Sequence, residues 1–256
     1  MADVYHLKLD RDALGGATVA VLPGDPGRVP LIATTIDPGA TPLAANREYT
    51  TWLARCEGRP VLITSTGIGG PSTAIAVEEL AQLGVRTFLR VGTTGSIQPG
   101  IELEDVIVTS ASVRLDGTSR HYAPIEYPAV AHHEVVAALV RAAKDLGLRH
   151  HVGITASSDS FYPGQERYST FSGYVIRAFR DSLEEWRRLG VLNYEMESAA
   201  LLTVCAAFGL RAGCVAGVVA QRDGREAVVE ASVRRGEVNA TAVAARVLPA
   251  LLTLDK

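Results

Sequence analysis

The chain has 256 residues, 47% of them hydrophobic and 21% charged, and a formal net charge of −3; these values are typical of a globular protein with one larger domain. No basic run stands out, which argues against nucleic acid as a partner, because proteins that bind nucleic acid usually carry a clustered positive surface. No stretch reaches the roughly 18 apolar residues of a membrane-spanning helix, and the first ten residues lack the apolar core of a signal peptide.

Predicted strands and helices alternate along the chain. Short apolar runs that end in Gly, Pro or polar turns predict strands, and longer segments with apolar residues three or four positions apart predict helices. We expect strands at residues 17–23, 59–67, 85–96, 104–115, 150–161 and 211–221. We expect helices within 68–84, 129–147 and 235–254, and a strand end that passes into a helix within 192–209. This alternation predicts a single α/β domain over residues 1–256, with a mixed, mostly parallel sheet wrapped by helices.

Cysteine and histidine spacing gives no sign of a metal site. Cys56, Cys205 and Cys214 are widely spaced in apolar surroundings and form no CxxC or Cys/His pattern. They predict a reduced, cytoplasmic protein. Adjacent histidines occur at 132–133 and 150–151, but neighbours in one element do not face a single ion together.

Two arginines follow or lie within predicted strands, at the sheet edge where ligands of such folds bind. The stretch PGDPGR at 23–28 turns tightly at Gly24 and exposes N–H groups, and Arg28 adds a guanidinium suited to phosphate. Arg90 lies inside an apolar strand and needs a partner, either a bound anion or a carboxylate. Gly24, Arg28, Arg90 and Thr93 together predict an oxyanion site without a metal. The alternatives are a solvated turn at Arg28 and a structural ion pair at Arg90.

The stretch FYPGQERY at 161–168 combines flat apolar faces with polar groups that recognise an amide. Phe161 and Tyr162 supply the faces, Gln165 both donates and accepts hydrogen bonds, and Arg167 donates. This pair suits an amide-like edge, such as the N3–H and carbonyl groups of uracil. The alternative is an exposed loop in which both side chains are solvated.

Residues 193–198, NYEMES, place two carboxylates before an apolar run, although a buried carboxylate is costly unless it is paired. If the strand extends to Glu197 and the helix begins near Ser198, Glu195 and Glu197 face one pocket. Such a pair suits a glycosidase or the binding of sugar hydroxyls. Negative charge at a helix start explains Glu197 without any ligand.

Together, these stretches resemble the uridine phosphorylases of the hexameric nucleoside phosphorylase family, within the purine/uridine phosphorylase superfamily. The resemblance covers nearly the whole chain and rests on PGDPGR, STGIGGPSTAIAVEELAQLG, LRVGTTGSIQPG, SVRLDGTSRHYAP, TASSDSFYPGQERY and NYEMES, in this order. YPGQERY is the most specific motif, because it separates the uridine enzymes from their purine relatives. After Arg222, the segment 223–238 departs from the family pattern. The resemblance implies the nucleoside phosphorylase fold, whose mixed sheet is partly barrel-like.

The resemblance also implies roles for individual residues. Phosphate would be bound by Gly24, Arg28, Arg90, Thr93 and, from a neighbouring subunit, Arg47. Ribose would contact Thr93, Met196, Glu197 and, across a dimer interface, His6. The base would contact Thr94, Gly95, Phe161, Gln165, Arg167 and Glu195, the last of which would orient Arg167 or the base through water. The catalytic residues would be Arg28, Arg90, Glu197 and Arg222, with Arg222 stabilising the uracil leaving group. A potassium or similar monovalent ion would bind at the dimer interface near Glu48, Ile68 and Ser72.

The implied activity is the reversible, phosphate-dependent cleavage of uridine to uracil and ribose 1-phosphate by a cytoplasmic homohexamer, a trimer of dimers. No cofactor is required, because phosphate is a co-substrate. Gln221 stands where the purine enzymes carry an aspartate, which disfavours purine cleavage. The alternatives are a broader pyrimidine nucleoside phosphorylase that accepts 2′-deoxyuridine or thymidine, a nucleoside hydrolase, and a non-catalytic nucleoside-binding protein on the same fold.

Overall fold

The structure is a computed structural model that describes residues 3–222 and 230–254. Its strands are β1 (Val19–Pro23), β2 (Thr41–Asn46), β3 (Tyr49–Cys56), β4 (Arg59–Thr64), β5 (Thr87–Ser96), β6 (Val106–Leu115), β7 (Ala129–Val130), β8 (His150–Ser158), β9 (Asn193–Glu195) and β10 (Arg211–Gln221). Its α-helices are α1 (Arg28–Ile36), α2 (Gly70–Leu83), α3 (His133–Asp145), α4 (Ser182–Arg188), α5 (Ser198–Ala207) and α6 (Glu230–Leu251). Short 3₁₀ helices occupy Asp12–Leu14 (η1), Thr118–His121 (η2), Pro163–Gln165 (η3) and Arg177–Phe179 (η4).

The α/β fold expected from the sequence is confirmed, and each expected strand and helix is present with its ends moved by a few residues. The structure adds α1, β2, β3, β7 and α4, which the sequence pattern did not predict. The strand that was expected to extend to Glu197 ends at Glu195, and α5 begins at Ser198 as expected.

The strands form one mixed sheet in which five members close into a barrel. The order is β10-β6-β8-β9-β5-β1-β4-β3-β2, and β10 also pairs with β5, so β10, β6, β8, β9 and β5 form a closed ring. The central pairs β1–β4, β1–β5 and β5–β10 are parallel. Antiparallel pairs at β3–β4 and β2–β3 extend the sheet to one side. The strand ends that follow β1, β5 and β10 therefore meet at one edge.

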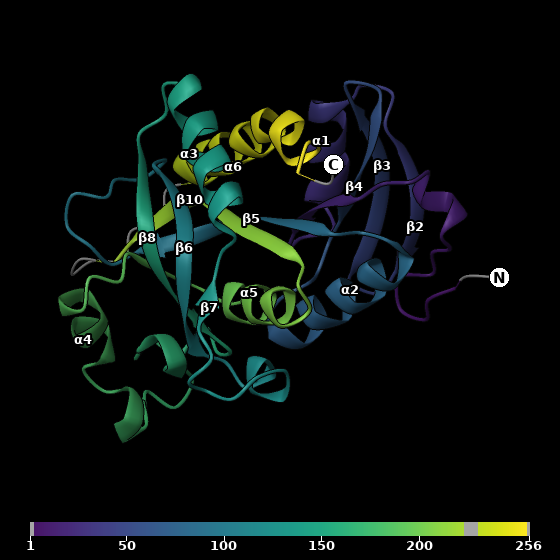
Figure 1. The fold of residues 1–256 in the computed structure, drawn as a ribbon. Coiled ribbons are helices and arrows are strands. Elements are labelled where there is room, and N and C mark those ends of the chain that lie inside the picture. Colours follow the sequence, from purple (N-terminus) through teal and green to yellow (C-terminus); the bar gives the residue numbers. More distant parts are fainter. Residues whose placement is uncertain (1–2, 223–229, 255–256) are drawn as a thin grey trace.

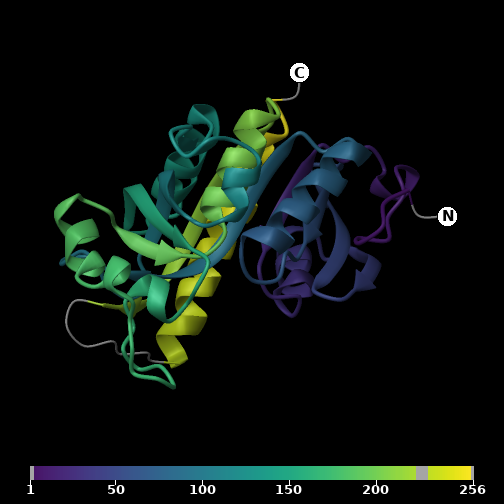
Figure 2. The ribbon, with the colours of Figure 1, turned by 90° about the horizontal axis from the view of Figure 1, so that it is seen from below.

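Helices cover the sheet on two faces (Figure 1). Helices α1, α3 and α6 pack on one face, where Ile32, Leu139 and Val247 belong to one buried core. Helices α2 and α5 pack together on the other, where Val77 and Leu201 belong to a second core. Figure 2 shows β2–β4 at one end of the molecule and α4 at the other.

Helix α6 lies unusually close to β10, because glycines face each other at their crossing. A Cβ atom added at Gly217 of β10 would collide with the backbone of Gly236 in α6. This close approach brings the next residue of the helix, Glu237, to the strand ends. Among the helices that the structure describes, none is long and apolar enough to cross a membrane.

Candidate active site

A cavity of about 780 Å³ opens where the ends of β1 and β5 meet β9 and β10. Most residues that the sequence predicted for a site line it, although they come from distant parts of the chain. These are Gly24, Arg28, Glu48, Ile68, Arg90, Thr93, Thr94, Gly95, Phe161, Gln165, Arg167, Glu195, Met196 and Glu197. His6, Arg47, Ser72 and Arg222 do not line this cavity.

Arg90 of β5 is buried in the cavity wall and contacts two carboxylates. Its Nε lies 3.0 Å from Glu195 Oε2, and its Nη2 donates to Glu197 Oε2. Although burial opposes it, the two negative charges raise the pKa of Arg90, so the guanidinium stays charged. Its Nη1 is buried and has no hydrogen-bond partner among the described residues. Arg90 therefore forms the structural ion pair that was one alternative, and the binding of an anion at its Nη1 stays a prediction.

Glu195 joins Arg90 to the start of α5. Its Oε2 accepts the backbone N–H of Glu197 at 2.9 Å, and its Oε1 accepts the Ser198 hydroxyl at 2.5 Å and the Ser198 N–H at 3.0 Å. Although burial acts to raise it, Arg90 and these hydrogen bonds hold the pKa of Glu195 below its ordinary value. Glu195 therefore orients Arg90 and caps a helix; that it also orients Arg167 or the base through water stays a prediction.

Glu197 directly precedes α5, and it lines the cavity. Its Oε1 accepts the Gly69 N–H at 2.6 Å, while its Oε2 contacts Arg90. Burial raises the pKa of Glu197; Arg90 opposes the rise, and the nearby charge of Glu195 adds to it. Each carboxylate oxygen has two lone pairs, so each keeps the capacity to accept a ligand hydroxyl.

Arg28 stands at the first position of α1, opposite Arg90 in the same cavity. The turn before it is built by Asp25, whose Oδ1 accepts the Gly27 N–H at 2.8 Å. At Gly24 a side chain would approach the Gly67 carbonyl to 3.2 Å, which explains a glycine there. Burial lowers the pKa of Arg28, an effect that Glu237 partly offsets. Arg28 Nε is buried without a hydrogen-bond partner among the described residues, and Nη1 lies 3.9 Å from Glu237 Oε1.

The end of β5 lies between the two arginines and the rest of the cavity. The Thr94 hydroxyl donates to the Tyr194 carbonyl at 2.6 Å and accepts from Asn193 at 2.7 Å, so it serves the strand pairing of β5 and β9. Thr93, by contrast, points a half-buried side chain at the cavity. At Gly95 a side chain would lie 3.4 Å from Arg222 Cδ, so the glycine makes room for that arginine.

The opposite end of the cavity is formed by the loop around η3. Arg167 stacks over Phe161, with its guanidinium carbon 3.9 Å from the ring centre. Its Nη1 donates to the Phe161 carbonyl at 2.8 Å and to Gln165 Oε1. Gln165 is 3% exposed, so the expectation of a solvated loop does not hold for this side chain.

Arg222 lies behind this end of the cavity rather than on its wall. It is buried, its Nη2 donates to the Gln165 carbonyl at 2.7 Å, and its guanidinium carbon is 5.5 Å from the Tyr194 ring centre. Gln221 turns the other way, because its amide donates to the Ile101 carbonyl at 2.9 Å. Of the segment 223–238 that departs from the family pattern, residues 223–229 lie outside the described residues.

His6 and Arg47 lie away from this chain's cavity and close to each other. His6 Nδ1 is 2.7 Å from Glu79 Oε1, and the side chain of Asn46, which precedes Arg47, donates to the His6 carbonyl at 2.7 Å. Arg47 is exposed and adopts a φ of 54° at the β2–β3 turn. That both serve the site of a second subunit stays a prediction.

The residues predicted to hold a monovalent ion lie around Gly67, close to the start of α2. The Ser72 hydroxyl donates to the Ile68 carbonyl at 3.3 Å, and a Cβ added at Gly67 would lie 2.9 Å from Glu48 Cβ and 3.5 Å from Ser72 Oγ. Carboxylate, carbonyl and hydroxyl oxygens are the donors that a hard cation prefers, so the residues fit such an ion.

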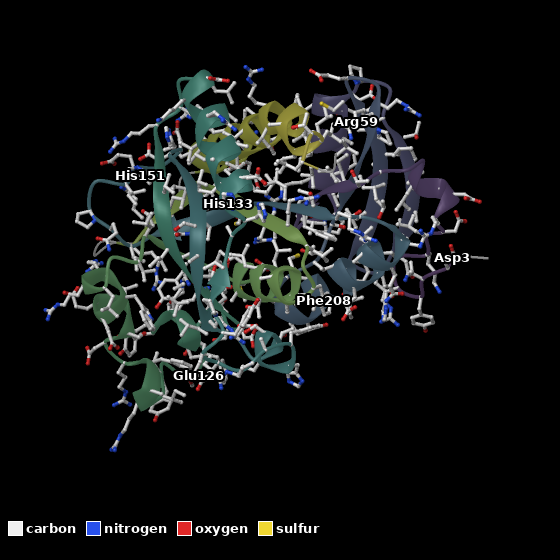
Figure 3. The ribbon with its side chains drawn as sticks, in the orientation of Figure 1. Asp3, Arg59, Glu126, His133, His151 and Phe208 are labelled. Atoms are coloured by element: carbon white, nitrogen blue, oxygen red, sulfur yellow. The ribbon has the colours of Figure 1, made fainter. Side chains whose placement is uncertain are left out.

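The histidine pairs do not form a metal site in the part of the chain that the structure describes. Figure 3 labels His133 on α3 and His151 on β8, which are separate elements. His151 Nε2 is 2.9 Å from Asp105 Oδ2, which gives it a structural partner. No group of three or more His, Cys, Asp or Glu side chains is placed to hold a metal among the described residues.

Several cavity residues were missed in the sequence. Asp25, Tyr194, Val219, Ala220 and Glu237 all line the cavity. Val219 and Ala220 lie near the end of β10, where Ala220 is paired with Gly95 of β5. They belong to the apolar run VAGVVAQ, which predicts a strand, but only the β5–β10 pairing places them at the cavity. Glu237 carries no local signal, because a charged residue on a helix usually faces solvent.

Comparisons with known proteins agree with this geometry. The family model of the phosphorylase superfamily matches residues 18–252. The chain is 59% identical to the uridine phosphorylase of Escherichia coli (strain K12), over 94% of this chain and 95% of that protein. It is 53% identical to the uridine phosphorylase of Haemophilus influenzae over 99% of this chain and 100% of that protein, and 49% identical to that of Thermococcus kodakarensis over 94% and 84%.

Proposed function

Because the chain belongs to the phosphorylase superfamily, we propose that it catalyses the reversible phosphorolysis of uridine to uracil and ribose 1-phosphate. It is a pentosyltransferase of the uridine phosphorylase kind, as its 53–59% identity to uridine phosphorylases over nearly its whole length indicates. The structural observation that carries this function is the pair of guanidinium groups, Arg28 and Arg90, that line the same cavity. Arg28 Nε and Arg90 Nη1 have no hydrogen-bond partner among the described residues, which suits a bound oxyanion.

Phosphate and ribose fit the end of the cavity that holds the arginines. Arg28 and Arg90 would bind the phosphate oxygens, with the turn at Gly24 and the Thr93 hydroxyl as further donors. Glu197 would accept the 2′- and 3′-hydroxyls of ribose, since its oxygens face the cavity and keep free lone pairs. Met196 would lie against the sugar. Glu195 supports this arrangement by fixing Arg90 at 3.0 Å.

The reaction breaks the C1′–N1 bond of uridine and forms a bond between C1′ and a phosphate oxygen. As the first bond stretches, positive charge develops on the ribose ring, and the phosphate dianion beneath C1′ both stabilises this charge and attacks it. The electron pair of the broken bond leaves on uracil, whose N1 gains the proton that hydrogen phosphate gives up, through solvent. The residues therefore act by positioning and by electrostatic stabilisation.

Uracil fits the opposite end of the cavity. Gln165 and Arg167 form a hydrogen-bonded pair next to Phe161, which suits recognition of the N3–H and carbonyl edge. Negative charge that develops on the carbonyl oxygens would be stabilised by Arg167 and, from behind Gly95, by Arg222. No general acid is needed, because this charge is delocalised over the ring.

The assembly and the ion belong to the same proposal. A homohexamer with shared sites would place His6 and Arg47 of one subunit at the cavity of its neighbour, and the exposure of Arg47 supports this role. A monovalent ion at Glu48, Ile68 and Ser72 would supply charge balance at that interface, and no catalytic step depends on it. A cytoplasmic location is proposed from the three free cysteines.

The test is the release of uracil from uridine with and without phosphate, followed by absorbance in strong base, with thymidine and inosine in parallel. We expect release only with phosphate, and uridine well ahead of inosine. Equal release without phosphate would indicate a hydrolase. Equal rates with thymidine would indicate a broader pyrimidine phosphorylase, and no release from any of the three would indicate a binding protein.

A further inference from the structure

Arg187, in the short helix α4, contacts the chain directly after two strands of the site. Its Nε donates to the Ile97 carbonyl at 2.7 Å, and its Nη2 donates to the Arg222 carbonyl at 2.9 Å. Ile97 follows β5, and Arg222 follows β10. The guanidinium therefore links the carboxyl ends of two neighbouring strands that belong to distant parts of the sequence.

The two strand ends that Arg187 links carry the residues at the base end of the cavity. In the β5–β10 pairing, Gln221 lies opposite Ser96, and Ala220 lies opposite Gly95. The Arg222 N–H also donates to the Ser96 carbonyl at 2.9 Å, so the backbone of Arg222 is fixed from both sides. Displacing this backbone would displace the Arg222 side chain, which packs beside Gly95 and donates to the Gln165 carbonyl.

We propose that Arg187 is a positioning residue that holds the base end of the cavity in its productive geometry, above all the guanidinium of Arg222. This inference rests on the proposed function, since it gives Arg187 an indirect role in the step in which uracil leaves. Arg187 reaches no reacting atom itself, and it acts through the backbone of Ile97 and Arg222. Phosphate binding at Arg28 and Arg90 is independent of it, because no contact joins Arg187 to those residues among the described ones.

The geometry needs an arginine at this position. The Nε and Nη2 of Arg187 donate to two different carbonyls, those of Ile97 and Arg222. Its Nη1 contacts Glu184 Oε2 at 2.8 Å, so all three nitrogens of the planar group are used. A lysine has one ammonium group and would reach one carbonyl at a time. The next residue, Arg188, gives a matched contrast: it contacts the same Glu184 at 2.9 Å, but its side chain is 79% exposed.

The kinetic test compares Arg187→Gln with Arg188→Gln, with uridine varied at saturating phosphate and phosphate varied at saturating uridine. For Arg187→Gln we expect kcat/KM for uridine to fall about tenfold, because small displacements of a catalytic group have effects of this size or larger, while KM for phosphate stays unchanged. The loss should be smaller with 5-fluorouridine, whose leaving group is more acidic and needs less stabilisation. Arg188→Gln should match the wild type, and Arg187→Lys should fall between the two.

Hydrogen exchange gives a second readout that does not depend on activity. The amides of Ile97 and Arg222 should exchange faster in Arg187→Gln and at the wild-type rate in Arg188→Gln. An inactive wild-type protein would refute the proposed function, and exchange at these amides would still decide whether Arg187 holds the strand ends. The inference is overturned if exchange is unchanged, or if uridine, 5-fluorouridine and phosphate kinetics all change equally alongside a lower Tm.

Discussion

The two ends of the cavity are held in different ways. At the end proposed to bind phosphate, called the phosphate end below, Arg90 is buried between two carboxylates, one of which also caps α5, so the cation is part of the core of the protein. At the base end, Arg167 donates to the Phe161 carbonyl and to Gln165, Arg222 donates to the Gln165 carbonyl, and Phe161 is 48% exposed. The phosphate end is thus fixed by the fold, whereas the base end depends on contacts between loops and strand ends.

The different ways in which the two ends are held predict whether a substitution changes stability and activity together or changes activity alone. Substitutions in the buried cluster of Arg90, Glu195 and Glu197 should affect stability and activity at once, because buried charges lose their partners. Substitutions at the base end should alter uridine kinetics with little effect on phosphate or on folding.

The largest effect is expected for Arg90→Gln. The change leaves two buried carboxylates with no cation, which should cost about 3–5 kcal/mol of the free energy of unfolding and lower kcat/KM by about a thousandfold. Thermal unfolding and steady-state kinetics measure the two losses. The matched control is Arg86→Gln, at an exposed arginine just before β5. A variant with wild-type Tm would contradict the central place of Arg90 in the core.

The base end is tested by Gln165→Leu. The amide that contacts Arg167 is lost from a buried position, so KM for uridine should rise about tenfold or more. KM for phosphate should stay within about twofold of the wild type, since the change lies at the other end of the cavity. Equal increases in the two KM values would show that the ends of the cavity are not independent.

The pH dependence of the reaction tests the paired carboxylates. Because the pKa of Glu197 is raised, kcat/KM for uridine should fall as the pH falls through a value above the ordinary 4.3 or so of glutamate. Glu195→Gln removes a negative charge that helps to raise this pKa, and it frees Arg90 for Glu197. Both effects lower the pKa of Glu197, so the acidic limb of the pH profile should move to lower pH. An unchanged or higher midpoint would rule out this coupling.

The smallest effect is expected for Glu237→Gln. The Glu237 carboxylate lies 3.9 Å from Arg28 and lines the same cavity, so it competes with phosphate for that cation. Its removal should lower KM for phosphate about two- to threefold, the size expected for a partly exposed ion pair. Glu230→Gln on the same helix is the control, because the Glu230 side chain is 84% exposed. A raised KM for phosphate would mean that Glu237 instead helps to hold Arg28.

Most of the buried, regular elements were predictable from the sequence, although α1 and β3 were missed despite the buried side chains of Ile32 and Tyr49. The exposed or short elements β2, β7 and α4 were not predictable. Strand β5 and helix α2 show clear apolar patterns, whereas β2 is an edge strand with exposed residues and a proline at Pro42. Helix α4 has seven residues and is rich in charge, so it resembles a solvated loop. The local pattern reports burial, and these segments are little buried.

For the site, the sequence indicated the candidate residues but not the way they pair. Arg90 and Glu197 could be singled out because each is a charge beside an apolar run. Their contact joins residues 107 positions apart, and no spacing rule indicates it. Glu237 and Arg187 lie on helices where a charged side chain is ordinary, so only the packing of α6 on β10 and of α4 on the strand ends identifies them.

The most direct test of the whole account is the phosphate dependence of uracil release by the wild type and by Arg28→Gln. Arg28 reaches the cavity from a turn and has one distant ion pair, so this variant should fold normally. We predict that the wild type releases uracil only with phosphate, and that Arg28→Gln raises KM for phosphate about a hundredfold while KM for uridine is unchanged. Release without phosphate, or an unchanged KM for phosphate in the variant, would contradict the account.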